Sequence, residues 1–286
     1  MTTPLPEDHS DLAKITKELL RKYALVPSKH QGQNFAIDPY LFQTILQGAD
    51  LQTNDIVLEI GPGLGFLTKL IARHVKQVIT IEKDPILATI LSRELIPTQN
   101  NISLITSDAL ALSLPPFTTF MSNLPFNVSV PLTLKMFREC TFDKFVATYQ
   151  KEVAVRLCAQ PGSKYFSRLS VISALRGRWK KLKTFPPRSF YPAPKVAASV
   201  LKFIPNSSYP KEIFSNQFEK YIETVFQHRR QKLRNSLRSF AKMHVKNQLY
   251  QKVITKIDQL PLKDQRPFTL EPMELYEIYI ELFKLH

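Results

Sequence analysis

Cysteine is scarce in this chain, and features that define several large protein classes are missing with it. Two cysteines, Cys140 and Cys158, cannot build a disulfide framework, so we expect free thiols in a reducing compartment. No apolar run approaches the roughly 20 residues that span a bilayer, and residues 1–11 lack the apolar core of a signal peptide. We therefore expect a soluble, cytoplasmic protein with no membrane partner.

Motifs for metal binding and nucleotide hydrolysis are also missing. The six histidines are scattered, and the sequence contains no HExxH pattern, no cluster of cysteine and histidine, and no lysine-bearing phosphate loop. The sequence thus predicts neither a metal site nor NTP hydrolysis.

Acidic residues are absent from two long stretches of a chain whose net charge is +15. No carboxylate side chain lies between Glu152 and Glu212 or from Thr224 to Ile257, and both stretches are rich in lysine and arginine. General solubility needs only dispersed charges of both signs, whereas single-sign segments of this length favour a polyanion. We interpret the partner as nucleic acid rather than a membrane surface.

Hydrophobic periodicity predicts an α/β fold followed by helices. We expect helices at 11–24, 39–48, 66–74 and 85–95, and strands at 55–61, 77–82, 102–108, 119–123, 145–150 and 197–203. Residues 205–210 are typical of a linker, and the chain from Glu212 onward is helical in pattern and contains no glycine. The predicted domains are 1–205, with a parallel sheet, and 206–286, small and all-helical.

A glycine loop, Gly61-Pro62-Gly63-Leu64-Gly65, stands between a predicted strand and a predicted helix. Dinucleotide sites need G-x-G-x-x-G, but this spacing is G-x-G-x-G, so a pyrophosphate fits poorly. S-adenosylmethionine has no phosphate, and the backbone at Gly61 and Gly63 can approach it closely. Glu82 ends the second strand, where it can accept hydrogen bonds from both ribose hydroxyls. Asp108 ends the third and can accept one from the cofactor's adenine amine.

Asn123-Leu124-Pro125-Phe126 follows the fourth strand and predicts methyl transfer to an exocyclic amine. The lone pair of an adenine N6 amine is spread into the ring, so the nitrogen is a poor nucleophile. The Asn123 amide oxygen and a backbone carbonyl of the next turn can accept its two hydrogens and aim the lone pair at a methyl group. Pro125 fixes the turn, and Phe126 offers a flat surface for an unstacked base.

These motifs resemble those of the small-subunit ribosomal RNA adenine N6-dimethyltransferase family, in the style of its archaeal and eukaryotic members. The matching segments run in order along most of the chain: Gly32–Phe35, Val57–Gly65, Ile81–Asp84, Ser107–Leu110, Ser122–Phe126, Tyr149–Ala154, Tyr165–Ser170, Ser189–Val196 and Arg229–Asn235. The resemblance implies a Rossmann-like S-adenosylmethionine-dependent methyltransferase sheet with a helical C-terminal domain. It also implies dimethylation of two adjacent adenines near the 3′ end of small-subunit rRNA, and a part in small-subunit biogenesis.

The resemblance further implies roles for individual residues. Asn34 and the Ala36 backbone would contact the cofactor together with Gly61, Glu82, Asp108 and Asn123, and Phe190 would help Phe126 to hold the flipped adenine. The family most often has Leu, Tyr and Asp where this chain has Ala36, Phe126 and Ala197. Phe126 keeps the stacking surface, and a main-chain contact at Ala36 is insensitive to the side chain, so we expect an active enzyme.

RNA binding is predicted for a basic stripe in the C-terminal region. Arg230, Arg234, Arg238 and Lys242 recur every fourth residue, as on one side of a helix, while Leu233, Leu237 and Phe240 would face the core. A solvated helix face is the plainer alternative. Trp179, among lysines and arginines, is favoured as a core or surface anchor over a base-stacking residue. The expected partner is small-subunit rRNA or the pre-ribosomal small subunit, bound by a monomer.

Two other functions share parts of this pattern. A DNA adenine methyltransferase uses the same active-site logic, but such enzymes usually carry a separate target-recognition domain, for which this chain has no room. A non-catalytic assembly or transcription factor would use the fold only for binding, and the intact Asn123-Leu124-Pro125-Phe126 motif argues against that as the sole role.

Overall fold

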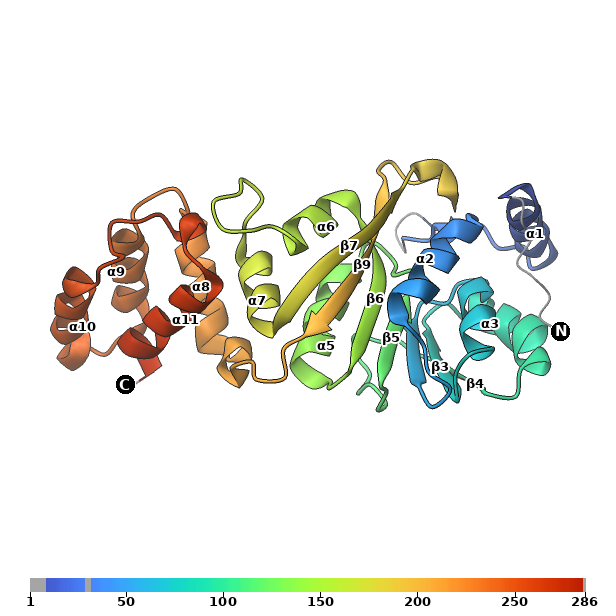
Figure 1. The fold of residues 1–286 in the computed structure, drawn as a ribbon, viewed down its shortest axis with the longest axis horizontal. Coiled ribbons are helices and arrows are strands. Elements are labelled where there is room, and N and C mark those ends of the chain that lie inside the picture. The colour runs from blue at the N-terminus through green and yellow to red at the C-terminus, as the bar shows by residue number, and fades with distance from the viewer. Residues whose placement is uncertain (1–8, 29–31, 285–286) are drawn as a thin grey trace. The chain divides into compact units, whose positions relative to one another are not determined.

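The computed structural model describes residues 9–28 and 32–284, which form two compact units (Figure 1). The first contains the described residues of Met1–Ala154 together with Trp179–Pro205, and the second those of Val155–Arg178 and Asn206–His286. Val155–Arg178 therefore groups with the C-terminal residues, whereas the sequence placed it in the range 1–205. The physical reason is burial, because Phe166, Val171 and Leu175 belong to the hydrophobic core of the C-terminal helices. Residues 1–11 were predicted to lack the apolar core of a signal peptide, and residues 1–8 of this segment lie outside the described residues.

A seven-stranded sheet with the order β4-β3-β2-β5-β6-β9-β7 supports the first unit. Its strands are β2 (Ile56–Ile60), β3 (Gln77–Glu82), β4 (Ile102–Thr106), β5 (Thr119–Ser122), β6 (Lys144–Gln150), β7 (Gly177–Phe185) and β9 (Ala198–Pro205). The five strands from β4 to β6 are parallel, and β9 runs antiparallel to β6. From β2 the chain adds β3 and β4 on one side, and it then returns to add β5 and β6 on the other side of β2. The boundary between β2 and β5 is therefore a topological switch point, where ligands of open α/β sheets bind.

Helices cover both faces of this sheet because its central strands are apolar on both sides. The helices of this unit are α1 (His9–Lys22), α2 (Pro39–Ala49), α3 (Phe66–Ala72), α4 (Pro85–Ile90) and α5 (Ser129–Glu139), and α6 (Lys151–Leu157) follows β6. Single turns of other helix types lie at Leu91–Leu95, Ile96–Thr98 and Pro187–Ser189. Asp38 and Asp84 cap α2 and α4, each followed by a proline at the first helical position.

Trp179 lies on β7, a strand that the sequence did not predict. Its ring packs against Phe137 of α5 and against Phe145 and Phe203 of the sheet, with ring centroids 4.7–6.0 Å apart. This tryptophan is therefore a packing residue, in agreement with the favoured prediction.

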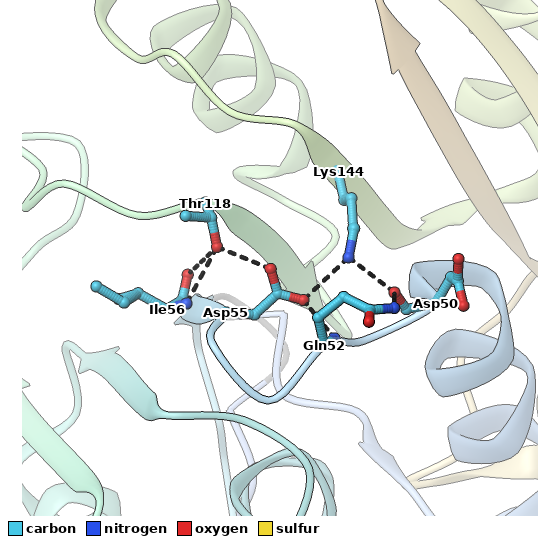
Figure 2. Close-up of polar contacts among 6 residues, drawn as sticks. All are labelled: Asp50, Gln52, Asp55, Ile56, Thr118 and Lys144. Atoms are coloured by element: carbon cyan, nitrogen blue, oxygen red, sulfur yellow. Dashed lines mark hydrogen bonds and ion pairs between the residues drawn. The ribbon is translucent and has the colours of Figure 1, made fainter.

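A polar network ties together the amino ends of three adjacent strands (Figure 2). Asp55, just before β2, accepts hydrogen bonds from the Gln52 backbone amide, from the Thr118 hydroxyl before β5, and from Lys144 Nζ at the start of β6, at 2.7, 3.1 and 3.0 Å. Burial by itself would raise the pKa of Asp55, but these three donors outweigh it and lower the pKa. The carboxylate stays charged and fixes the strand ends at the edge of the sheet away from their carboxyl ends.

A second, two-stranded sheet joins segments that are far apart in the sequence. In it β1 (Phe35–Ala36) pairs antiparallel with β8 (Phe190–Tyr191), so that Ala36 lies opposite Phe190. The buried Ser189 hydroxyl donates to Asp38 Oδ2 at 2.7 Å, beside this pair. The pairing holds the predicted base-binding Phe190 next to the predicted cofactor-binding segment.

The second unit is helical. Its helices are α7 (Arg168–Arg176), α8 (Asn216–Gln227), α9 (Leu233–His244), α10 (Asn247–Gln259) and α11 (Pro272–Tyr279), with shorter helical turns at Lys211–Phe214, Pro267–Thr269 and Ile280–Lys284. Tyr221, Leu237 and Phe240 are fully buried in its core, and the Tyr221 hydroxyl donates to the Leu275 carbonyl at 3.1 Å. The predicted fold class, an α/β sheet with a helical C-terminal region, is confirmed. Within the described ranges, every helix is too short or too polar to cross a bilayer.

Candidate active site

A cavity of about 320 Å³ lies at the carboxyl ends of the parallel strands β2, β3, β4 and β5. It brings together every predicted cofactor residue and the whole asparagine motif: Asn34, Ala36, Gly61, Gly63, Glu82, Asp108, Asn123, Leu124, Pro125 and Phe126. The residues from Gly61 to Phe126 meet because parallel strands end at one edge of the sheet, and Ala36 reaches the cavity from β1 of the separate two-stranded sheet, with Asn34 just before that strand. Among the predicted catalytic and cofactor residues, Phe190 alone does not line the cavity; its ring packs against Phe126, which does.

The glycine loop leaves its backbone open to a ligand. Gly61 and Gly63 have φ of +69° and +59°, in the left-handed region that favours glycine. A Cβ at Gly61 would lie 2.7 Å from Pro125 Cγ, and one at Gly63 would lie 3.1 Å from the Phe35 ring. The loop thus touches the asparagine motif directly, and any side chain at Gly61 would fill the space between them.

Glu82 is held in place by backbone donors. Its Oε1 accepts from the Asp84 amide at 2.9 Å and its Oε2 from the Gly63 amide at 3.3 Å. The side chain is 5% exposed, and this burial raises its pKa. The carboxylate is therefore oriented toward the glycine loop, where it can accept hydrogen bonds from a sugar.

Asp108 remains charged at the mouth of the cavity. Its Oδ2 accepts from Lys83 Nζ at 2.6 Å and its Oδ1 from the Leu110 amide at 2.9 Å. The hydrogen bond from Lys83 is the main cause of a lowered pKa. A cofactor amine at Asp108 would share the carboxylate with this lysine, whose own side chain is largely exposed.

Glu59 is a cavity residue that the sequence analysis did not single out. It lies on β2, is 1% exposed, and its Oε2 accepts from the Thr68 hydroxyl at 2.6 Å. Burial raises the pKa of Glu59 to about 8, helped by the nearby charge of Glu82. The signal was available, because Glu59 interrupts the otherwise apolar run Val57-Leu58-Glu59-Ile60.

Glu59 predicts a pH dependence of stability. The folded state keeps its proton up to about pH 8, whereas an exposed glutamate loses it near 4.5. Between these values the folded state binds more protons than the unfolded state, so stability falls as pH rises, by up to about 1.4 kcal/mol per pH unit. Glu59→Gln, which keeps an acceptor for Thr68, should flatten this decline in urea unfolding at pH 5, 6.5 and 8. Parallel curves for the two proteins would contradict it.

Asn123 carries a buried acceptor that is left unused. Its Oδ1 is shielded from solvent and has no hydrogen-bond partner among residues 9–28 and 32–284. The preceding residue, Ser122, donates from its hydroxyl to the Ile60 carbonyl at 2.6 Å, which joins the ends of β5 and β2. An unpaired buried acceptor is unfavourable unless a ligand satisfies it. The arrangement suits a donor such as an amine.

Phe126 and Phe190 form the aromatic part of the site. Their ring centroids are 5.9 Å apart with an interplanar angle of 66°, an edge-on contact. Phe190 is 2% exposed, while Phe126 is half-buried and lines the cavity. Asn34 Nδ2 donates to the carbonyl of Gly32 at 3.1 Å, and a Cβ at Gly32 would lie 3.3 Å from the Phe126 backbone nitrogen.

The predicted RNA-binding residues belong to the second unit and do not line this cavity. Arg234, Arg238 and Lys242 lie on α9, and Arg230 precedes it. Arg234 pairs with Asp264 at 3.2 Å and Arg238 with Asp258 at 2.6 Å. Two of the four basic residues of the stripe thus form ion pairs with aspartates from later in the chain, although the stretch that carries the stripe contains no acidic residue. The described residues hold no cluster of three His, Cys, Asp or Glu side chains that could bind a metal ion.

Comparison with known proteins decides the family. The family model described as ribosomal RNA adenine dimethylase matches residues 27–270. This chain belongs to the ribosomal RNA adenine dimethylase family. The predicted resemblance is confirmed, and with it the reaction class: the chain is an rRNA adenine dimethyltransferase that uses S-adenosylmethionine.

Archaeal proteins are among the relatives of the dimethylase. A probable ribosomal RNA small subunit methyltransferase A of Methanosphaera stadtmanae is 36% identical over 269 residues, which cover 93% of this chain and 97% of the relative. Another, of Methanothermobacter thermautotrophicus, is 36% identical over 270 residues, or 94% and 96% of the two chains.

Solved structures share the fold of the dimethylase. A dimethyladenosine transferase from Plasmodium falciparum superposes with a TM-score of 0.78 at 25% identity, covering 87% of this chain and 98% of that one. The 23S rRNA methyltransferase ErmE, at 24% identity and a TM-score of 0.64, shows the same fold over 87% of this chain and 99% of that one.

The cavity of the dimethylase fits its cofactor. S-adenosylmethionine needs a close backbone approach, a carboxylate for its ribose and an acceptor for its adenine amine. Gly61 and Gly63, whose left-handed backbone leaves room for a ligand, the oriented Glu82 and the charged Asp108 are groups of these three kinds.

Proposed function

We propose that this dimethylase methylates N6 of two adjacent adenines near the 3′ end of small-subunit rRNA, giving N6,N6-dimethyladenosine. The unpartnered Oδ1 of Asn123 is the observation that carries the proposal. We further propose that it works as a cytoplasmic monomer on pre-ribosomal small subunits and contributes to their maturation. The archaeal relatives, whose names specify the small subunit, support this choice of RNA.

The proposed mechanism assigns positioning and electrostatics to the protein. The bound cofactor supplies a methyl group made electrophilic by an adjacent sulfonium. Asn123 Oδ1 accepts a hydrogen bond from the N6 amine, which would hold the nitrogen near a tetrahedral shape with its lone pair directed at the methyl group. N6 would form its bond to the methyl carbon as the carbon–sulfur bond breaks, and would then lose one proton. Phe126 stacks on the adenine, and Phe190 supports Phe126 from its edge. Glu82 and Asp108 hold the cofactor's ribose and adenine.

On the RNA side, we propose that Arg230, Arg234, Arg238 and Lys242 contact backbone phosphates. Arg234 and Arg238 would exchange their aspartate partners for phosphate, which is feasible because these ion pairs are about half exposed.

The test is transfer of a labelled methyl group from S-adenosylmethionine to unmethylated small ribosomal subunits, followed by nucleoside analysis. We expect N6,N6-dimethyladenosine, and no transfer to duplex DNA. Label in duplex DNA would favour a DNA adenine methyltransferase. Tight binding of the particle without any transfer would favour an assembly factor that does not catalyse.

A further inference from the structure

A second hollow, of about 660 Å³, lies on the surface of the second unit. Four basic side chains line it, Arg156, Lys164, Arg168 and Arg229, with a single carboxylate, Glu223. Its residues come from α6, from the loop before α7, from the start of α7, from the second half of α8 and from the residues just after α8. They belong to Val155–Arg178 and to the C-terminal helices, both within one compact unit. The charge of this hollow suits a polyanion.

Tyr165 gives the hollow a stacking surface. Its side chain is 44% exposed, and Lys164 Nζ lies 5.0 Å from the centre of its ring. Aromatic faces beside cations are the pattern of single-stranded nucleic acid sites, where the bases stack and the phosphates are held by charge. An acidic peptide would satisfy the cations but has no need of the ring.

The loop that carries Tyr165 is held in place by a buried neighbour and by hydrogen bonds from Arg229. Phe166 is fully buried in the core of the helical unit. Arg229 donates from Nη1 to the Phe166 carbonyl and from Nη2 to the Lys164 carbonyl, the latter at 2.6 Å. Arg229 is thus a positioning residue that holds Tyr165 outward, and it is set apart from the cations that would bind phosphate.

The charged residues of the hollow can exchange partners. Arg168 Nη1 lies 3.0 Å from Glu223 Oε1, and the two side chains are 51% and 66% exposed. An ion pair this exposed is weak, so a phosphate can replace Glu223. Arg156 is placed beside them because the Ser170 hydroxyl of α7 donates to its carbonyl at 2.6 Å and joins α6 to α7.

We propose that this hollow binds an unstacked nucleotide of the rRNA substrate, with its base on Tyr165 and its phosphates on Arg156, Lys164 and Arg168. The site deepens the proposed function, on which its choice of RNA rests. The proposal gives Val155–Arg178 a part in RNA binding. The sequence analysis had placed this segment in the predicted domain 1–205, whereas the structure groups it with the C-terminal helices.

The first experiment compares Tyr165→Ala with Tyr165→Phe in the full chain, by equilibrium binding to unmethylated small subunits at fixed salt. Loss of the ring should weaken binding about tenfold, whereas phenylalanine keeps the face and should bind within about twofold of the unchanged protein. The KM for the particle should rise in Tyr165→Ala while kcat and S-adenosylmethionine affinity stay unchanged. Equal affinities of the two variants would overturn the proposal.

A second pair of variants tests the charges in opposite directions. Glu223→Gln removes the competitor of phosphate at Arg168 and should tighten RNA binding a few-fold. Arg168→Gln should weaken it and reduce the slope of log K against log salt by about 0.7–0.9. Unchanged affinity in Glu223→Gln together with an unchanged salt slope in Arg168→Gln would overturn the phosphate assignment.

The outcomes separate this site from the proposed function. If the unchanged protein transfers methyl groups and its RNA binding does not depend on Tyr165, the proposed nucleotide site is wrong and the proposed reaction is supported. RNA binding that depends on Tyr165, without methyl transfer, would support the hollow and overturn the reaction. Arg168-dependent binding of polyglutamate, with RNA binding unaffected by Tyr165→Ala and by Arg168→Gln, would assign the hollow to an acidic protein instead.

Discussion

Asn123→Ala is expected to lower kcat for methyl transfer by about 10²–10³-fold, the usual effect of losing one preorganised hydrogen-bonding group at a reacting centre. The side-chain oxygen is buried and has no partner in the described part of the chain, so its removal breaks no hydrogen bond of that oxygen and relieves an unsatisfied acceptor. Stability should therefore change little or rise. Affinity for small subunits should persist, because the charges that hold RNA are elsewhere.

The measurement is single-turnover methyl transfer with saturating particles, alongside thermal unfolding. Asn54→Ala is the matched control, since Asn54 is exposed in the turn before β2 at the other end of the strand. It should have the activity of the unchanged protein. If Asn123→Ala kept full kcat, the amine would have to be oriented by other groups, and the central assignment of the active site would be wrong.

Gly61→Ala is expected to abolish S-adenosylmethionine binding in the accessible concentration range, a loss of more than about 100-fold. Two effects combine at this position. A left-handed φ of +69° costs a non-glycine residue about 1–2 kcal/mol. In addition, the new Cβ would lie 2.7 and 2.9 Å from Pro125 Cγ and Cδ, so the loop or the asparagine motif must move.

Gly162→Ala separates the two effects. Gly162 has a similar φ of +82°, but apart from its chain neighbours no heavy atom in the described ranges lies within 4 Å of a Cβ built there. This variant should lose comparable stability through backbone strain and keep its cofactor affinity. Calorimetric titration with S-adenosylmethionine, paired with thermal unfolding, gives both quantities. Equal cofactor affinity in the two variants would show that the contact with Pro125 has no role in binding.

The site was largely predictable because its residues obey a local rule. Gly61, Glu82, Asp108 and Asn123 each follow a strand, and apolar runs ending in glycine or a polar residue are visible in the sequence. Once the strands are taken as parallel, their ends must meet. The protonation of Glu59 could not be predicted in the same way, because it depends on burial and on neighbours contributed by α3 and β3.

Elements that depend on distant partners were missed. Strand β7 contains Lys180, Lys181 and Lys183, which hide the alternation of a strand; the sheet accepts them because β7 is an edge. Arg234 and Arg238 form ion pairs with aspartates that lie 30 and 20 positions later in the chain. A sequence stretch without acidic residues can therefore still fold into a surface that contains acidic side chains. The grouping of Val155–Arg178 with the C-terminal helices likewise depends on where Phe166 is buried.

The two-stranded pairing of β1 with β8 is a physical route by which the two substrates can influence each other's binding. Ala36, whose backbone is expected to contact the cofactor, lies opposite Phe190, proposed to support the base, and Asn34 directly precedes this ribbon. A ligand that orders one strand lowers the entropy that the other ligand must still remove, so each should bind more tightly in the presence of the other. This coupling is reciprocal by necessity. It would favour binding of the RNA base while the methyl donor is in place, for the first methyl group and again for the second.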